Sequence, residues 1–313
     1  MAPPLDHRDR ETEGTTLPSE DLLARHLVAN GTGFRLSAVD PADTDGIENK
    51  KAAKKRLRAA INRLTELQSQ LYAQDRWAAL FIFQAMDAAG KDGTIKHVMS
   101  GVNPQGCQVH SFKAPSKEEL DHDFLWRCAR ALPERGRIGI FNRSHYEEVL
   151  TVRVHPEFLQ HQRIPEGLVT ENIWKERFED IRHFERHLNR NGVIIRKFFL
   201  HISKEEQKRR FLDRMDAPEK HWKFSPADVT ERDYWEDYMS AYEEAIRETS
   251  TPEAPWVVAP SDHKWYARVV VAETIVQALE SLDLGYPTAS PEAKEGMALA
   301  RATLESESSV DPS

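Results

Sequence analysis

The chain has 313 residues, of which 40% are hydrophobic, and this is enough for one main domain with a substantial core plus smaller appendages. Its formal net charge of -8 argues against general affinity for nucleic acid or acidic membranes, so a polyanion would have to bind at a local basic patch. No apolar run approaches membrane-spanning length, the N-terminus lacks the apolar core of a secretory signal, and Cys107 and Cys128 have no metal-ligand spacing. We therefore expect a cytoplasmic protein with buried thiols.

The N-terminal part is predicted to be an extension followed by a long helix. Residues 1–45 are expected to be partly disordered, with a short helix around residues 22–28. Over residues 47–76, apolar side chains recur at helical spacing among many Lys and Arg, which is typical of an amphipathic helix. The basic run at 50–56 could contact phosphates, but we interpret it as a solvated helix face.

Residues 79–93 predict a phosphate-binding loop, because they read ALFIFQAMDAAGKDG. The apolar run at the start has the length of a buried parallel strand. It leads into small residues and Gly90-Lys91, so that backbone N–H groups, a cation and a helix N-terminus can surround an anion. Ala85 stands where the usual motif has Gly, and Asp92 stands where it has a Mg²⁺-binding hydroxyl. We predict phosphate contacts from Ala88, Ala89, Gly90, Lys91, Asp92, Gly93 and Thr94.

Asp87 indicates a metal ion in this loop. A carboxylate inside an anion-binding loop repels the phosphate it faces unless a cation lies between them, and Mg²⁺ (or Mn²⁺) prefers a few carboxylates plus phosphate oxygens. Alternatively, Asp87 or Asp92 merely caps the following helix, and this fits Asp92 better than Asp87.

Two further strands are predicted, at residues 107–112 and 138–141, with a helix at 117–132 between them. Ser116 and Glu119 form a capping box for that helix. The resulting alternation of strands and helices predicts an α/β fold with a parallel sheet.

The second of these strands ends in Asn142 and Arg143, at the sheet edge where ligands bind in parallel sheets. In many P-loop enzymes this strand ends in an Asp that helps to hold the metal, and here Asn142 would be a weaker ligand. Arg143 can clamp a phosphate through two parallel hydrogen bonds. The alternative is a salt bridge from Arg143 to Glu147 or Glu148.

The second half of the chain continues the alternation and contains its densest basic region. After an irregular segment at 150–170, we predict helices at 172–191, 204–214, 231–247 and 264–282, and strands at 193–202 and 254–260. Basic residues concentrate between 204 and 223, where nucleotide kinases place a mobile lid, so we predict a lid at about 208–234. Residues 286–313 are expected to form an acidic, flexible tail.

Four motifs together resemble the polyphosphate kinase 2 family. They are FQAMDAAGKDGTIKHV at 83–98, GVNPQG at 101–106, FNRSHYEEVL at 141–150 and RRFLDRMDAPEKHWKFSPAD at 209–228. The resemblance implies a P-loop kinase-like three-layer α/β/α domain over residues 46–285, with a parallel central sheet and a helical lid. It also implies Mg²⁺-dependent, reversible phosphoryl transfer between inorganic polyphosphate and nucleotides, and a dimer or tetramer. The class III subgroup, which the chain resembles, phosphorylates both AMP and ADP to give ADP and ATP.

The resemblance also implies roles for individual residues. Asp87 would hold the metal, with a possible contribution from Asn142, or would orient the acceptor phosphate. Lys91 would bind the transferring phosphate, and Asn142 and Arg143 would occupy the Walker B position, with Arg143 as a catalytic residue. The basic lid residues that would contact polyphosphate or the acceptor are Arg209, Lys220 and Lys223.

Two other functions stay open at this point. One is an ATP-dependent nucleoside or nucleotide kinase of the same fold, which the changes at Ala85 and Asp92 disfavour. The other is a non-catalytic sensor that binds polyphosphate or nucleotide. Pure anion binding gains nothing from a carboxylate such as Asp87, whereas metal-assisted transfer does.

Overall fold

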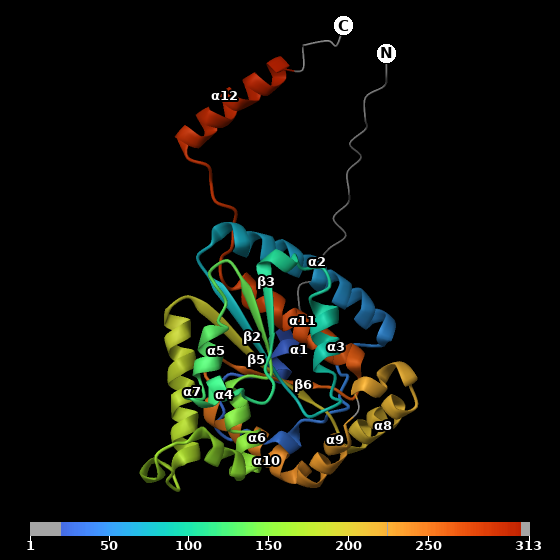
Figure 1. Cartoon of the computed structure of the whole chain (residues 1–313). Coiled ribbons are helices and arrows are strands. Elements are labelled where there is room, and N and C mark those ends of the chain that lie inside the picture. The colour runs from blue at the N-terminus through green and yellow to red at the C-terminus, as the bar shows by residue number, and fades with distance from the viewer. Residues whose placement is uncertain (1–19, 224, 308–313) are drawn as a thin grey trace.

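The fold is organised around a six-stranded sheet with the order β1-β6-β5-β2-β4-β3, drawn in Figure 1 from a computed structural model. The structure describes residues 20–223 and 225–307, so the expectations for residues 1–19 and 308–313 lie outside it. The strands are β1 (Leu27–Val28), β2 (Ala78–Gln84), β3 (Cys107–Ser111), β4 (Ile138–Asn142), β5 (Val193–His201) and β6 (Trp256–Pro260). All neighbouring pairs are parallel, as predicted, except that β1 pairs antiparallel with β6 at one edge. β1 was not predicted, because a strand of two residues gives no periodic signal. The short helix expected around residues 22–28 ends at His26 instead.

β2 lies inside the sheet, between β4 and β5, and every one of its residues is buried. The apolar run that predicted this strand is what a strand covered on both faces requires. Phe83 pairs with Asn142 in β4 and with Phe198 in β5, and its ring stacks on that of Phe198 at 4.9 Å between centroids. The chain leaves β2 toward β3 and β4 on one side and later enters β5 on the other. This makes the carboxyl end of β2 the topological switch point where parallel sheets bind ligands.

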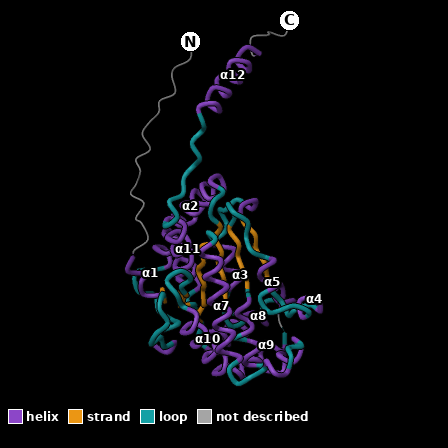
Figure 2. Tube along the Cα trace, turned by 90° about the vertical axis from the view of Figure 1, so that its left-hand side faces the viewer, coloured by secondary structure: helices purple, strands orange, loops and turns teal. Residues whose placement is uncertain are grey.

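Helices cover both faces of the sheet, which confirms the predicted α/β/α layering (Figures 1 and 2). One face carries α2 (Lys50–Gln74), α3 (Lys91–Val98) and α11 (Lys264–Glu280), and the other carries α7 (Ile173–Arg190) and α10 (Trp235–Thr249). The remaining helices are α1 (Glu20–His26), α4 (Lys117–Leu120), α5 (Trp126–Arg130), α6 (Thr151–Val154), α8 (Lys204–Met215), α9 (Pro226–Thr230) and α12 (Pro291–Glu307). Short 3₁₀ segments lie at Leu36–Ala38, Pro104–Gly106, His145–Glu148, Pro156–Gln162, Glu166–Leu168, Pro218–Lys223 and Glu231–Tyr234.

The helix predicted at 117–132 is wrong in extent, because the structure contains two short helices there, α4 and α5. The predicted capping box at the start is present: the Ser116 hydroxyl accepts from the Glu119 N–H, and the Glu119 carboxylate accepts from the Ser116 N–H. The break follows at Asp123, whose carboxylate accepts a hydrogen bond from the N–H of Leu125. Such local bonds from Asp compete with the helical pattern.

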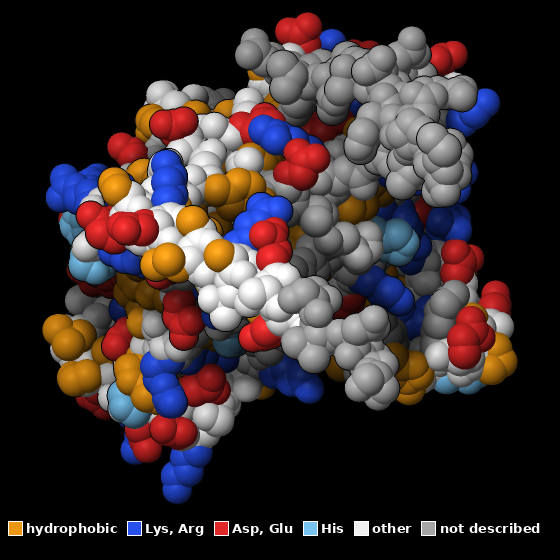
Figure 3. All heavy atoms as spheres, turned by 90° about the horizontal axis from the view of Figure 1, so that it is seen from above, with side chains coloured by type: hydrophobic (Ala, Val, Ile, Leu, Met, Phe, Trp, Pro, Cys, Tyr) orange, Lys and Arg blue, Asp and Glu red, His pale blue; other side chains and the backbone are white. Residues whose placement is uncertain are grey.

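The C-terminal segment contains a helix that the expectation of a flexible tail did not include. α12 begins at Pro291, a favoured first helical residue, and the Ser290 hydroxyl accepts from the Ala293 N–H. Both Figure 1 and Figure 2 show α12 standing away from the sheet and its helices, and all of its side chains are exposed. Figure 3 shows the molecule from above, and on the described part of the surface in that view hydrophobic, acidic and basic side chains are intermixed.

Neither cysteine lies in an environment that favours the reactive thiolate form. Cys128 is buried, as predicted, and Cys107 is only half-buried. Burial raises the pKa of Cys107 to about 11 and that of Cys128 to about 12.

Over the described residues, no helix is both long and apolar enough to cross a bilayer.

Candidate functional site

A cleft of about 720 Å³ lies at the carboxyl ends of β2, β3 and β4. It brings together Asp87, Lys91, Asp92, Asn142 and Arg143, all of which were predicted as site residues. Of the other loop residues that were predicted, Ala88, Gly90 and Gly93 also line the cleft. Ala89 and Thr94 do not line it and are buried instead. The sheet edge therefore collects most of the predicted set in one place.

The loop between β2 and α3 combines a sharply turned backbone with carbonyl groups that accept hydrogen bonds. Two of its residues adopt left-handed backbone conformations, Gly90 with φ of 104° and Ala88 with φ of 60°. Glycine adopts this conformation without strain, whereas alanine does so at a cost, which other contacts of the loop must offset. Donors occupy the carbonyl oxygens of the successive residues Ala85, Met86, Asp87, Ala88 and Ala89. The first N–H groups of α3 have no acceptor within the helix, and Lys91, Asp92 and Gly93 of that first turn line the cleft, so these groups are available to an anion there.

Lys91 is the first residue of α3 and is almost fully buried, with an exposed fraction of 9%. Its ammonium donates to the carbonyl oxygen of Ala85 at 2.6 Å, so the side chain is folded under the loop. Burial, and then the positive charge of Arg143, lowers the pKa of Lys91. An anion bound in the cleft would oppose both effects, because it favours the protonated amine.

Arg143 and Asp87 form an ion pair across the cleft. The guanidinium Nη2 lies 3.1 Å from Asp87 Oδ1, and the two side chains are 41% and 35% exposed. Arg143 has a left-handed φ of 64°, and its N–H donates to the carbonyl of Phe83, so the chain turns sharply at the end of β4. Strained residues of this kind concentrate at functional sites. The guanidinium also lies 4.0 Å from Glu147, so the alternative salt bridge and the cleft position coexist.

The acidic residues of the cleft suit a metal that is held largely by substrate. Asp87 and Asp92 both line the cleft, and Asn142 donates its amide N–H to Asp92 Oδ1 at 2.8 Å. Among residues 20–223 and 225–307, no group of three or more His, Cys, Asp or Glu side chains is arranged to hold a metal. Mg²⁺ commonly uses one or two carboxylates plus phosphate oxygens and water, and Asp87 and Asp92 fit that pattern.

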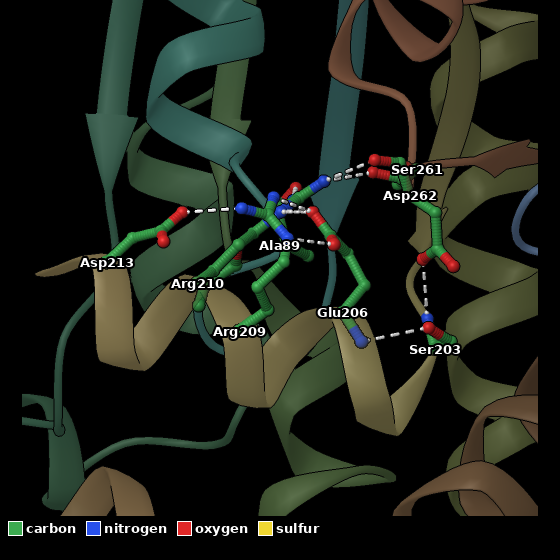
Figure 4. A network of polar contacts seen from close by, with 9 residues as sticks. Ala89, Ser203, Glu206, Arg209, Arg210, Asp213, Ser261 and Asp262 are labelled. Carbon is green, nitrogen blue, oxygen red and sulfur yellow. Dashed lines mark hydrogen bonds and ion pairs between the residues drawn. The ribbon is translucent and has the colours of Figure 1, made fainter.

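Arg210, in α8, is the residue that ties the loop to the rest of the fold (Figure 4). It is buried, with an exposed fraction of 5%, and burial lowers the pKa of its guanidinium. The guanidinium donates to Glu206 and to the backbone carbonyls of Ala88, Ala89, Ser261 and Asp262. These bonds join the phosphate loop, α8 and the segment after β6.

Replacing Arg210 with Met is expected to lower the free energy of unfolding by at least about 3 kcal/mol, because buried carbonyls lose their donor. The matched control is Arg209→Met, one residue earlier, whose exposed guanidinium bonds, among the residues that the structure describes, to Glu206 and Asp213 alone. That change should cost less than about 1 kcal/mol. Urea unfolding of the two variants measures the difference, and equal losses would contradict the structural role of Arg210.

Of the three lid residues chosen from the sequence, the structure describes the side chain of Arg209 alone, and this side chain does not line the cleft. Arg209 pairs with Glu206 and Asp213 along its own helix and does not line the cleft. The side chains of Lys220 and Lys223 lie outside the described part of the structure. α8 presents Arg210 and Arg214 to the cleft instead, and Arg214 pairs with Asp228 at 3.5 Å across the predicted lid.

Sequence reasoning also did not select several other residues of the cleft, among them Lys264 and Trp222. Lys264 is the first residue of α11, directly after β6 and the short turn that follows it. The rule that places ligands at the carboxyl ends of parallel strands could have identified it. Trp222 lies in the lid and is 79% exposed. No local pattern marks it, because a single exposed aromatic residue is common on protein surfaces.

Comparisons with known proteins show what the chain as a whole is similar to. Residues 47–285 match the family model described as polyphosphate kinase 2 (PPK2). The chain is 57% identical over 245 residues to the ADP-polyphosphate phosphotransferase of Rhodopseudomonas palustris, covering 78% of this chain and 85% of that protein. It is 47% identical over 266 residues to the AMP/ADP-polyphosphate phosphotransferase of Meiothermus ruber, covering 85% and 96%. The crystal structure of polyphosphate kinase 2 from Arthrobacter aurescens TC1 superimposes with a TM-score of 0.81 at 42% identity, covering 93% of this chain and 98% of that one.

Proposed function

The chain belongs to the polyphosphate kinase 2 family, and from this premise we propose that it transfers phosphoryl groups from inorganic polyphosphate to AMP and to ADP. The observation that carries the proposal is the convergence of Lys91, Arg143 and Asp87 on one cleft behind a phosphate-binding loop. The names of the relatives from R. palustris and M. ruber support polyphosphate with ADP and AMP as the substrates.

The cleft residues suit phosphoryl transfer because this chemistry needs positioning and neutralisation of charge more than a nucleophile on the protein. The N–H groups at the start of α3 and the Lys91 ammonium would bind the oxygens of the transferring phosphate. Arg143 would hold a second phosphate with paired hydrogen bonds, giving up its contact with Asp87. The acceptor is itself a phosphate, so no strong general base is required.

Mg²⁺ belongs to the same proposal. Asp87, with Asp92 beside the loop, would hold it against the bound phosphates. When bound, the ion would neutralise charge that develops on the phosphate oxygens. The proposal also includes reversibility and assembly into a dimer or tetramer, which rest on the family resemblance alone. It includes action in the cytoplasm as well, which rests on the cysteine usage and on the lack of a long apolar run in the sequence.

The test is product analysis with purified protein, Mg²⁺, long-chain polyphosphate and either AMP or ADP. ADP and ATP are expected from AMP, and ATP from ADP, only when polyphosphate is present. The control replaces polyphosphate with ATP as donor and offers AMP or a nucleoside as acceptor. Product formed only with ATP would identify an ATP-dependent kinase of the same fold. Binding of polyphosphate or nucleotide without any product, and without dependence on Mg²⁺, would instead identify a sensor.

A further inference from the structure

α2 carries a row of cations on its outer surface, which we call the α2 basic face. It consists of Lys50, Lys51, Lys54, Lys55 and Arg58, and all of these side chains are exposed. None of them forms an ion pair with any residue that the structure describes, whereas Arg56 and Arg63 of the same helix pair with Glu273 and Glu280. The face points away from the buried side of α2, which contains Ala53, Ala60 and Leu64.

This arrangement is unfavourable for the helix itself. The first turn of α2 contains Lys50 and Lys51 and no acidic residue, although a helix N-terminus prefers negative charge. Lys50 and Lys54 are four residues apart, as are Lys51 and Lys55, and like charges at this spacing repel each other. In an acidic chain with a net charge of -8, an uncompensated basic face that opposes the local rules is a sign of function.

The packing of α2 on α11 relates this face to the cleft. Arg56 bonds to Glu273 and Arg63 to Glu280 at the same separation of 217 residues, so the two helices run parallel. The same register places Lys51 level with Arg268 of α11. Figure 1 shows the N-terminal ends of α2 and α11 next to each other.

Cations connect the cleft with this end of α2. Lys264 lines the cleft, and Arg268 follows it by one helical turn. Arg268 Nη2 lies 3.8 Å from the position that a Cβ would take on Gly93, which also lines the cleft. From Lys51, the α2 basic face continues away from the cleft to Arg58, over roughly 10 Å at the rise of an α-helix.

We propose that the α2 basic face binds the part of a long polyphosphate chain that extends out of the cleft past Lys264 and Arg268. Polyphosphate fits this surface because it carries closely spaced negative charges along a flexible chain and offers nothing else to recognise. Exposed cations on a helix suit such a ligand, since binding depends on charge and on the release of counterions rather than on fixed geometry. The inference rests on the proposed function, and it specifies how the protein holds polyphosphate, the phosphoryl donor of that reaction.

The test compares a triple variant, Lys51→Ala, Lys54→Ala and Lys55→Ala, with a control that removes as many exposed cations from α7. The control is Lys175→Ala, Arg186→Ala and Arg190→Ala, none of which makes an ion pair with a described residue. In the α2 variant, KM for long-chain polyphosphate should rise at least about fivefold and depend less on salt. KM for a polyphosphate too short to leave the cleft, KM for AMP, and kcat should stay as in the wild type. Thermal stability should be equal or higher, because alanine favours the helix and the repulsion is gone.

An unchanged KM for long-chain polyphosphate in the α2 variant, or an equal rise for the short donor or in the α7 control, would overturn the inference. Binding of labelled long-chain polyphosphate is measured beside turnover. If the wild-type protein binds the polyphosphate chain through the α2 basic face but forms no product, the proposed function is refuted, whereas the assignment of the α2 basic face as a polyphosphate-binding surface is supported. Single-stranded RNA that competes as well as polyphosphate of equal charge would overturn the assignment to polyphosphate.

Discussion

Replacing Lys91 with methionine is expected to lower kcat/KM with polyphosphate by at least about a thousandfold, which is roughly 4 kcal/mol of transition-state stabilisation. The ammonium lies under the phosphate loop, where little water is present to screen its charge from a bound phosphate. Methionine has a similar length and no charge. Steady-state kinetics with saturating AMP or ADP, together with the free energy of unfolding, measures the effect.

The fold should survive this change, because burial lowers the pKa of Lys91 and so places a cost on its charged form in the folded protein. This cost is fully present below the lowered pKa of the folded state and is lost as pH rises from there to the ordinary lysine value of 10.5, whereas a neutral side chain removes it at any pH. Lys96→Met is the control, since Lys96 is exposed on the same helix. Retention of more than about a tenth of the wild-type activity by Lys91→Met would refute the catalytic role.

Replacing Asp87 with asparagine is expected to lower kcat by at least about a hundredfold and to raise the Mg²⁺ concentration required for half-maximal activity. Asparagine keeps an oxygen that can accept the hydrogen bond from Arg143, so the change removes charge more than shape. Without that charge, a metal in the cleft loses its carboxylate on the phosphate loop. Titration of activity with Mg²⁺ in wild type and variant measures both effects, and chelation of the metal should abolish wild-type turnover.

The matched control is Asp213→Asn. Asp213 also lines the cleft, but its carboxylate is engaged by Arg209 on the outside of α8. Its Mg²⁺ requirement should match that of the wild type. If Asp87→Asn kept its activity and its Mg²⁺ requirement, the metal would have to be held elsewhere and Asp87 would serve only to position Arg143.

Local patterns were sufficient for the part of the molecule that carries the phosphate loop. A continuous apolar run has few alternatives to a buried strand, and β2 is buried along its whole length. Asn142 and Arg143 were identified because parallel strands end at a common edge of the sheet. Two residues that directly follow a strand were therefore expected to lie near the phosphate loop, which follows another strand. The same local reasoning failed at 117–132, where the side chain of Asp123 competes for the backbone and two helices replace one.

The sequence by itself determined the succession of strands and helices along the chain, the phosphate loop and the basic character of α8. Only the tertiary structure decided which cation of α8 reaches the loop. Arg209 and Arg210 are adjacent in sequence, but successive side chains on a helix point about 100° apart, so Arg210 meets the loop and Arg209 faces solvent. Lys264 reaches the cleft only because β6 lies beside β5 in the sheet. Directions of this kind depend on how elements pack against one another, and the linear sequence does not contain that information in any local pattern.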